Sequence, residues 1–305
     1  MKILITGGAG YIGAELVKSL TNQHQVETIT VYDNLSRGNY NFFLGDALPA
    51  GKIKFINGEI LDSRKLRKAL QDTDVVYHFA AKVTTPFSNI DGHSYEQTNH
   101  WGTAELVYAL EETDVQQIIF LSSTGVYGTT KNPADEHTEP HPDSFYAISK
   151  LRAEQHIQRL QSKMKTHILR MGNVYGFSRS MRFDAVINRI MFDAHFAGRI
   201  TINGTGQQHR SFIHIHKAAD VLSKFPFTEI PNGIYNAVDK TLSILDIVEA
   251  VKKLYPDLES FFINQHYAVH NLEVKRSDLL HQYIPIVETI LEDELTAFKN
   301  KFSFG

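Results

Sequence analysis

The chain has 305 residues, of which 42% are hydrophobic and 21% charged, as in an ordinary globular protein long enough for two domains. Its 31 basic and 34 acidic residues give a net charge of −3, which argues against nucleic acid or an anionic membrane as a partner. Because cysteine is absent, disulfides, thiolate metal sites and cysteine nucleophiles are excluded. The sequence shows neither a secretory leader nor an apolar run of membrane-spanning length, so we expect a cytoplasmic protein.

The first recognisable pattern is an apolar strand that runs directly into a glycine-rich turn. Ile3 to Ile5 is an unbroken apolar run, and the helix-forming stretch Ala14 to Leu20 follows the turn. The turn contains Gly7, Gly8, Gly10 and Gly13, which give Gly-x-Gly-x-x-Gly and a second, overlapping spacing. Between a strand and a helix, such glycines make a tight bend, admit a pyrophosphate to the backbone and let the helix pack closely. The pattern predicts a dinucleotide site with the pyrophosphate at the helix N-terminus, and a plain structural turn is the alternative.

A second strand pattern, Glu27 to Tyr32, ends at an acidic residue, Asp33. This carboxylate lies about 20 residues after the last glycine, where it would bind a ribose 2′-hydroxyl. A carboxylate at that place repels a 2′-phosphate, so the sequence favours NAD over NADP. Arg37 keeps NADP open as the alternative, because a nearby arginine could accept the phosphate.

Strand and helix patterns then alternate through the first half of the chain. We expect strands over 52–56, 74–79, 117–122 and 167–170, and helices over 63–70 (capped by Ser63), 95–111 and 144–161. This alternation predicts an α/β fold, a Rossmann-type doubly wound parallel sheet whose strand C-termini form the ligand edge. The rhythm breaks after about Gly176, and a later helix is expected over 243–255. We therefore predict an NAD-binding domain over 1–176 with a return segment over about 211–239, and a smaller C-terminal α/β substrate lobe over 177–305.

Tyr146 and Lys150 stand four residues apart on a predicted helix, so their side chains share one helix face. A free tyrosine titrates near pH 10, and a neighbouring ammonium would stabilise the phenolate and lower its pKa. Ser123, at the end of the fifth predicted strand, could hold a substrate hydroxyl that Tyr146 deprotonates while hydride passes to a nicotinamide. Taken alone, the pair could equally be an exposed pair on a helix surface.

Together these segments resemble an extended short-chain dehydrogenase/reductase. More narrowly, the chain resembles the NAD-dependent nucleotide-sugar epimerase/dehydratase family, which includes UDP-glucose 4-epimerase, over nearly its full length. The segments that carry the resemblance are Gly7-Gly-Ala-Gly-Tyr-Ile-Gly13, Asp33-Asn-Leu-Ser-Arg-Gly38, His78-Phe-Ala-Ala81, Asn99, Ser122-Ser123, Val126-Tyr-Gly128, Tyr146 with Lys150, and Arg170-x-Gly-Asn-Val-Tyr-Gly176.

The resemblance implies a role for each matching position. The residues implied to contact NAD are Gly7, Gly10, Tyr11, Ile12, Gly13, Asp33, Asn34, Glu59, Ile60, Ala80, Ala81, Lys82, Asn99, Tyr146 and Lys150. Tyr146 matches the catalytic base, Lys150 the lysine on the nicotinamide ribose, and Ser123 the partner of the substrate hydroxyl. The residues expected to bind the nucleotide-diphosphate sugar are Ser123, Thr124, Asn173, Arg182, Asn188 and Arg210. The family also implies a homodimer, formed when the helices over 95–111 and 144–161 pair with their copies in a bundle.

Departures from the family pattern bear on the subclass. Sugar 4,6-dehydratases that resemble this chain carry an Asp-Glu or Ser-Glu pair where this chain has Thr124 and Gly125, which disfavours a dehydratase. Epimerisation at C4 through a transient 4-keto sugar needs only Tyr, Ser and NAD. A nucleotide-sugar dehydrogenase or reductase, a dehydratase and a non-catalytic NAD-binding protein remain alternatives.

Further departures concern the substrate side. The family's usual Arg-Asp-Phe-Ile-His-Val-Asp-Asp here reads Arg210-Ser-Phe-Ile-His-Ile-His-Lys217. A second diphosphate arginine has no clear counterpart, and His266, His270, Arg179 or Arg182 could compensate. His214 and His216 alternate along a strand-like run, but without a third ligand we predict no metal site.

Overall fold

The computed structural model describes residues 1–45, 48–49, 51–83, 91–264 and 271–304, and its largest element is a seven-stranded sheet. The strand order is β10-β6-β5-β4-β1-β2-β3, and every neighbouring pair is parallel. The strands are β1 (Lys2–Thr6), β2 (Thr28–Asp33), β3 (Ile53–Asn57), β4 (Val75–His78), β5 (Gln117–Ser123), β6 (Lys165–Met171) and β10 (Gly233–Ala237). The order reverses between β1 and β4, where a doubly wound sheet opens its ligand crevice.

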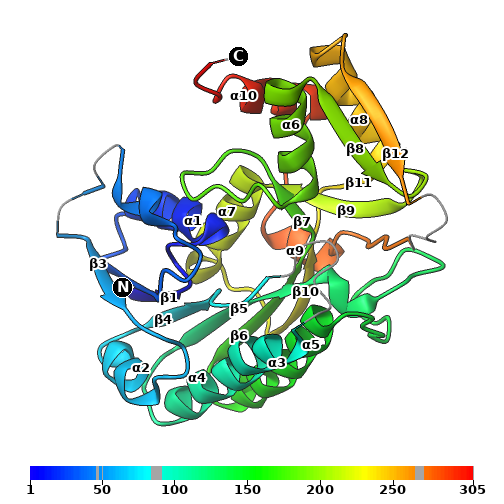
Figure 1. Cartoon of the computed structure of the whole chain (residues 1–305). Helices are drawn as coiled ribbons and strands as arrows, with labels where there is room; N and C mark the ends of the chain where they lie inside the picture. The colour runs from blue at the N-terminus through cyan, green and yellow to red at the C-terminus, as the bar shows by residue number, and fades with distance from the viewer. Residues whose placement is uncertain (46–47, 50, 84–90, 265–270, 305) are drawn as a thin grey trace.

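Helices cover both faces of this sheet (Figure 1). One face carries α1 (Tyr11–Thr21), α7 (Ile215–Lys224) and α9 (Asp278–Tyr283), and the other carries α2 (Ser63–Leu70), α4 (Gly102–Glu111) and α5 (Phe145–Gln158). Each layer buries an apolar face against strands that are apolar on both sides, as expected for a parallel sheet. The predicted Rossmann-type α/β fold is therefore confirmed.

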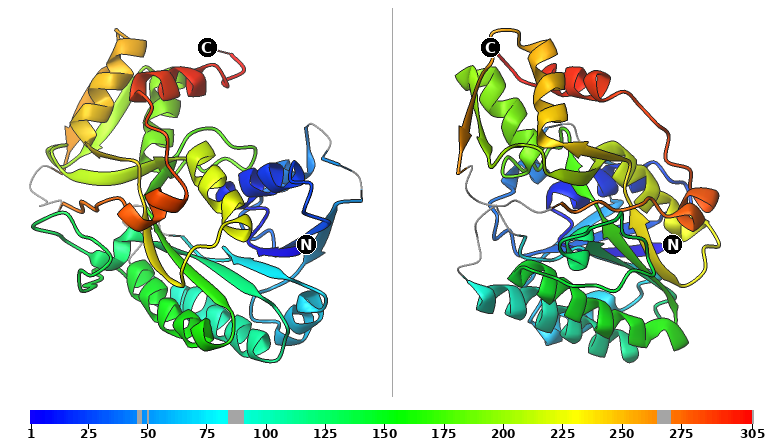
Figure 2. Two further views of the ribbon diagram at one scale, coloured as in Figure 1. Left: turned by 180° about the vertical axis from the view of Figure 1, so that it is seen from behind. Right: turned by 90° about the vertical axis from the view of Figure 1, so that its right-hand side faces the viewer.

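A second, smaller body of structure sits beyond the C-terminal ends of the strands (Figure 2). It contains a three-stranded sheet of β11 (Lys240–Ser243), β9 (His209–His214) and β7 (Asn173–Tyr175), and a parallel pair of β8 (Arg199–Asn203) with β12 (Glu259–Ile263). The helices α6 (Val186–Ala197), α8 (Ile244–Leu254) and α10 (Leu291–Lys299) pack around a separate core. The smaller C-terminal sheet that the sequence predicted is present.

The chain between β9 and β11 passes back to the large sheet. After β9, the helix α7 packs against α1, and β10 then pairs with β6 as an edge strand. β9 itself belongs to the smaller sheet, so this segment divides its elements between the two bodies.

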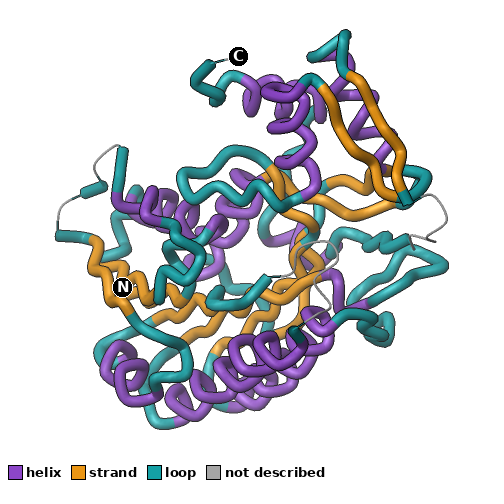
Figure 3. Tube along the Cα trace, viewed as in Figure 1, coloured by secondary structure: helices purple, strands orange, loops and turns teal. Residues whose placement is uncertain are grey.

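The structure corrects two details of the sequence analysis. The helix expected over 95–111 is divided into α3 (Gly92–Tyr95), a π-helical turn η2 (Glu96–Trp101) and α4. Figure 3 shows the helices, strands and loops of the molecule in separate colours. The cap of α2 is Asp62, whose Oδ1 accepts the Lys65 N–H at 3.0 Å, and not Ser63. Among the described residues there are also four short 3₁₀ turns: η1 (Tyr40–Phe43), η3 (Thr124–Tyr127), η4 (Arg159–Ser162) and η5 (Phe225–Phe227).

Four charged side chains hold α10 against the remainder of the fold. Lys217 lies 2.5 Å from Asp239 and 3.2 Å from Glu294, and Lys240 lies 2.8 Å and 3.2 Å from the same two carboxylates. The Tyr175 hydroxyl also donates to Glu294. Because two positive and two negative charges meet there with little exposure, each charge is compensated within the cluster.

Candidate active site

Two connected cavities lie at the C-terminal edge of the large sheet, where β1 and β4 diverge. A groove of about 500 Å³ follows the glycine turn, and a cavity of about 930 Å³ continues from it beneath the smaller body. Tyr11, Ile12, Phe79 and Arg182 line both. This arrangement has room for a long ligand in the groove and for a second ligand, end to end with it, in the cavity.

The glycine turn has no room for side chains. Gly7 has a φ of +70°, and a Cβ on it would lie 2.6 Å from the Ala80 nitrogen. A Cβ on Gly13 would lie 2.6 Å from the Gly8 Cα, so any larger residue would push the turn open. The helix α1 begins at once after Gly10 without a side-chain cap, which leaves its N-terminus facing the groove for an anion.

At the far end of the groove, Asp33 is held by backbone donors. Its Oδ2 accepts the Ala9 N–H at 3.0 Å and its Oδ1 accepts the Leu35 N–H at 2.8 Å. Burial raises the pKa of Asp33, and these two hydrogen bonds act in the opposite direction. Beside it, the Asn34 amide donates to Glu59 at 2.6 Å, so these three polar side chains line one end of the groove.

The side chain of Arg37 is engaged in an ion pair and is not free to turn toward Asp33. Its guanidinium lies 3.3 Å from Asp184, which also accepts from Arg182 Nε at 3.1 Å. This pairing connects the loop after β2 with the loop before α6 and occupies the arginine that could have favoured a 2′-phosphate.

The remaining wall of the groove contains Ile60, Ala80, Ala81 and Lys82. Asn99 is fully buried behind this wall and is absent from the lining: its Oδ1 accepts the Lys82 N–H at 2.7 Å, and its Nδ2 donates to the Lys82 carbonyl at 3.0 Å. The π-helical turn η2 contains Asn99, and its amide also donates to Ser149 on α5 at 2.9 Å. Asn99 therefore fixes the backbone beside the groove and does not face it.

Ser123, Tyr146 and Lys150 meet where the groove joins the cavity. Ser123 ends β5, and Tyr146 lies in the first turn of α5, which begins at a Ser144 cap whose Oγ accepts the Ala147 N–H. Burial raises the pKa of the Tyr146 phenol, and the Arg182 charge and a hydrogen bond with Ser123 lower it in part. The phenol thus has two neighbours that favour the phenolate.

Lys150 is 2% exposed and lies one helical turn from Tyr146. Its ammonium lies 4.1 Å from the centroid of the Phe120 ring, and burial lowers its pKa to about 7. The negative charge of Glu154 acts in the opposite direction. Lys150 is therefore able to change charge near neutral pH.

Most of the expected substrate residues line the cavity. Thr124, Asn173, Arg182 and Arg210 all contribute to its wall. Burial lowers the pKa of Arg210, and the carboxylate of Asp143 acts against that shift.

Asn188 lies outside the lining of both cavities. It is fully buried, with its Oδ1 accepting the Gly176 N–H and its Nδ2 donating to the Tyr11 hydroxyl and the Arg182 carbonyl. We therefore interpret Asn188 as a residue that holds the loop before α6, and it is not carried into the proposed substrate site.

Several lining residues had no recognisable local signal in the sequence. Asp143, Asn264, Asn271 and Leu272 reach the cavity from distant segments. Leu272 does so because its N–H pairs with the His209 carbonyl beside β9. Such long-range pairing leaves no pattern in a single sequence, although the polar character of the two asparagines is consistent with a nucleotide. His266 and His270, considered as substitutes for a second diphosphate arginine, lie outside the described residues.

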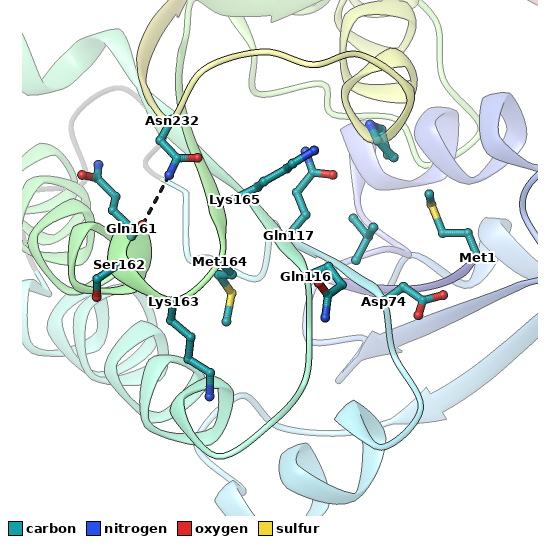
Figure 4. Close-up of a pocket in the computed structure, with 12 residues that line it drawn as sticks. Met1, Asp74, Gln116, Gln117, Gln161, Ser162, Lys163, Met164, Lys165 and Asn232 are labelled. Atoms are coloured by element: carbon teal, nitrogen blue, oxygen red, sulfur yellow. Dashed lines mark hydrogen bonds between the residues drawn. The ribbon is translucent and has the colours of Figure 1, made fainter.

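Two further features of the described residues, the pair His214 and His216 and a surface depression, are not assigned as ligand sites. No group of three or more potential metal ligands occurs among them, and His214 is the N-cap of α7, with burial lowering its pKa to about 4. A depression of about 620 Å³ lies at the opposite edge of the sheet, around Met1, Asp74 and Lys165 (Figure 4). Two of its polar side chains have protein partners: Lys165 pairs with Glu229, and Asn232 accepts the Thr166 N–H. No helix of the described chain has the length and apolarity needed to cross a membrane.

Comparison with known proteins agrees with this geometry. The model of the NAD dependent epimerase/dehydratase family matches residues 3–237. The chain belongs to this family. The enzyme is 30% identical to dTDP-D-glucose 4,6-dehydratase of Mus musculus over 272 residues, which are 85% of this chain and 74% of that relative. It is 32% identical to a putative UDP-glucose 4-epimerase of Methanocaldococcus jannaschii over 225 residues, 71% and 70% of the two chains.

The solved structures that are similar to this chain also include both epimerases and dehydratases. UDP-glucuronic acid 4-epimerase from Bacillus cereus in complex with NAD has a TM-score of 0.84 at 27% identity, with 98% of each chain covered. TunA, an NAD-dependent NDP-hexosamine 5,6-dehydratase, has a TM-score of 0.84 at 26% identity, with 98% of this chain and 97% of that chain covered. NAD is thus the cofactor of this enzyme, and the glycine turn with Asp33 fits its diphosphate and ribose.

Proposed function

We propose that the enzyme is an NAD-dependent epimerase of a nucleotide-diphosphate sugar, acting at C4 through a transient 4-keto sugar. The observation that carries the proposal is the surroundings of Ser123 and Tyr146 at the junction of groove and cavity. Thr124 and Gly125 follow Ser123, and a Cβ on Gly125 would lie only 3.2 Å from the Ser123 hydroxyl. Among the described residues of the cavity wall, the carboxylates are Asp143 and Asp184.

Neither carboxylate is suited to eliminating water from a sugar beside Ser123. Asp184 accepts from Arg37 and Arg182, and Asp143 acts electrostatically on Arg210. A 4,6-dehydratase needs an acid and a base at C5 and C6 in addition to the oxidation at C4. The cavity wall around Thr124 therefore supports oxidation and re-reduction without elimination.

In the proposed reaction, Ser123 accepts or donates a hydrogen bond at the C4 oxygen and holds it against Tyr146. Bound NAD would supply the hydride acceptor for the oxidation and the hydride donor for the re-reduction within the same turnover. Tyr146 removes the hydroxyl proton during oxidation and returns it during reduction, so it is a phenolate before the first step and again after the second, and the positive charge of Lys150 favours that phenolate. The cavity gives the keto sugar space to turn its other face to the cofactor. Arg210 and Arg182 are proposed to hold the nucleotide diphosphate, while Asn173 and Thr124 contact the sugar.

The test is to incubate the purified enzyme, without added cofactor, with UDP-, dTDP-, GDP- and CDP-sugars, including UDP-glucuronic acid. Products are separated by chromatography while NADH absorbance is followed. An epimer that forms without net NADH supports the proposal and identifies the substrate. Stoichiometric NADH with a keto or acid product would establish a dehydrogenase, and a dehydrated keto sugar would establish a dehydratase.

Tyr146→Phe provides the matched control, because it removes the proton-transferring oxygen and retains the ring. We expect it to lower kcat by about 10²- to 10⁴-fold, the usual contribution of a positioned acid or base. NAD binding by this variant should be retained. Tight NAD binding by the unmodified chain with no turnover of any sugar would favour a non-catalytic NAD-binding protein instead.

A further inference from the structure

Ser180 is a buried serine whose hydroxyl has no hydrogen-bond partner among the described residues. The residue is only 2% exposed, so its Oγ is also shielded from solvent. Ser180 nevertheless lines the groove, next to Met181 and Arg182. Because burying a hydroxyl without a hydrogen bond costs free energy, folded proteins seldom keep one that nothing meets. A ligand in the groove can supply the acceptor that this hydroxyl lacks.

The residues just before Ser180 are bound to the beginning of α1. The Ser178 hydroxyl donates to the Tyr11 carbonyl at 3.1 Å, and Ser178 is itself 1% exposed. The Arg179 N–H donates to Glu15 Oε1 at 3.4 Å. Tyr11 is the first residue of α1 and Glu15 lies one turn further along the helix. These two contacts hold Ser180 close to the end of α1 that follows the glycine turn.

This end of α1 favours an anion. No side chain caps the helix, and its first turn contains no acidic residue. The unpaired N–H groups and the helix dipole there attract negative charge. Gly10, Tyr11 and Gly13 line the same groove as Ser180. An anionic group bound at the helix end therefore shares the groove with the Ser180 hydroxyl.

We propose that Ser180 is a further cofactor-binding residue, whose hydroxyl donates a hydrogen bond to the diphosphate of NAD. The diphosphate is the part of NAD that carries negative charge at the helix end, and a charged oxygen is a stronger acceptor than a neutral one. The proposal rests on NAD as the cofactor and does not depend on the epimerase reaction. The segment between β7 and α6 that contains Ser180 also brings Arg182 and Asp184 to the larger cavity. One segment of the smaller body would thus contact both ligands.

The first experiment compares ligand binding by the full chain and by its Ser180→Ala variant. NAD and ADP-ribose are titrated by calorimetry, and adenosine by ligand-observed NMR. ADP-ribose retains the diphosphate but lacks nicotinamide, and adenosine lacks the diphosphate. Because the variant loses one hydrogen bond to a charged oxygen, we expect it to weaken NAD and ADP-ribose binding equally, by about 10- to 100-fold. Adenosine binding should be unchanged.

Urea denaturation without ligand separates this role from a structural one. Ser180→Ala should be at least as stable as the unmodified chain, because the hydroxyl that it removes has no partner among the described residues. The matched control is Ser223→Ala on α7, at a serine that is 4% exposed and lies outside the lining of both cavities. The Ser223 hydroxyl donates to the Asp220 carbonyl at 2.9 Å. The control should therefore lose stability while its NAD affinity stays unchanged, which is the opposite pattern.

Four results would overturn the proposal. Unchanged NAD affinity in Ser180→Ala would show that the hydroxyl does not bind the cofactor. A loss seen with NAD but not with ADP-ribose would assign the contact to the nicotinamide end, and an equal loss with adenosine would assign it to the adenosine end. A fall in the stability of ligand-free Ser180→Ala as large as that of Ser223→Ala would show that the hydroxyl has a protein partner. Since no measurement uses a sugar, failure of the epimerase proposal would leave this test unaffected.

Discussion

The carboxylate of Asp33 both holds the neighbouring backbone and lies at the expected cofactor site. A substitution of Asp33 should therefore affect both the backbone and cofactor binding. Its two oxygens hold the Ala9 and Leu35 N–H groups, and the same carboxylate lies where the adenosine ribose is expected. In Asp33→Asn, one of the two backbone hydrogen bonds is lost and the negative charge disappears. We expect NAD affinity to fall about 10- to 100-fold, since one hydrogen bond to a charged acceptor is worth roughly 1.5–3 kcal/mol.

The same variant should reduce the preference for NAD over NADP, because the charge that repels a 2′-phosphate is gone. Dissociation constants for both cofactors, measured by calorimetry, provide the check. Arg37→Gln is the control: since Arg37 is paired with Asp184, we expect NAD affinity to change little. An unchanged cofactor preference in Asp33→Asn would contradict the assigned role of the carboxylate.

At Lys217, the sequence reveals an unusual residue but does not reveal its contacts. Its departure from the family pattern was visible, because the pattern has aspartate there. The reason was not visible, since its partners Asp239 and Glu294 are distant in sequence. By contrast, local features such as a strand end and helical spacing were enough to predict that Ser123, Tyr146 and Lys150 lie together, and all three line the cavity. Their roles in a reaction stay predictions. Asn99 and Asn188 were chosen by resemblance, and the structure shows both as buried supports.

At the scale of elements, the glycine turn gives a sharp test. In Gly13→Ala, the new methyl group would meet the Gly8 Cα at 2.6 Å and the Gly7 carbonyl oxygen at 2.7 Å. Because backbone on both sides must move, we expect a loss of about 1–3 kcal/mol in unfolding free energy, the usual cost of overpacking. NAD affinity should fall as well, because the displaced backbone is the surface on which we expect the diphosphate to bind.

Chemical denaturation and NAD titration measure the two effects of Gly13→Ala. Gly233→Ala is the matched control, since its new Cβ would have its nearest neighbour, the Tyr235 hydroxyl, at an ordinary 3.5 Å. Equal behaviour of the two variants would show that the close approach at Gly13 does not constrain the turn.

The elements that sequence periodicity predicted well are those with strong local patterns. The parallel strands are short apolar runs, and α2, α5 and α8 match the helices expected at those places. The π-helical turn at Glu96–Trp101 could not be predicted, because the inserted residue leaves the apolar period intact on both sides. Asn99 lies within this turn, and its Oδ1 accepts the Lys82 N–H.

At the scale of the whole molecule, buried His78 makes stability depend on pH. Thr6 and Thr103 bind its two ring nitrogens, and burial lowers its pKa from 6.5 to about 3. The folded state therefore excludes a proton that the unfolded state takes up below pH 6.5. Its contribution to stability is complete above pH 6.5, and it is lost progressively as pH falls toward 3.

Urea denaturation at a series of pH values should show the unfolding free energy falling from pH 6.5 downward. The size should be of the order of several kcal/mol by pH 3, at about 1.4 kcal/mol per unit of pKa shift. His78→Gln cannot titrate, so its curve should lie lower at pH 7 but be flatter in acid. Parallel curves for the two proteins would refute this origin of the acid sensitivity.

The family resemblance implies a homodimer, and the helical layer of α4 and α5 offers a surface for it. Trp101 and Tyr108 on this layer are 50% and 40% exposed. We expect light scattering to give the mass of a dimer and Tyr108→Glu to shift it toward the monomer. Val287→Glu, at a 71% exposed position elsewhere, is the control and should remain dimeric. A monomer in the unmodified protein would contradict the expectation.

The contact between Tyr175 and Glu294 has a consequence for the synthesis of the protein. Tyr175 ends the short strand that begins at Asn173, and its hydroxyl partner is encoded 119 residues later. While the ribosome is still translating that interval, the large sheet can already begin to form, but the strand that begins at Asn173, on the cavity wall, lacks its support. Lys217 and Lys240 likewise lack their second carboxylate until Glu294 has been synthesised. The nascent chain can therefore acquire the groove along the glycine turn well before it acquires the finished larger cavity.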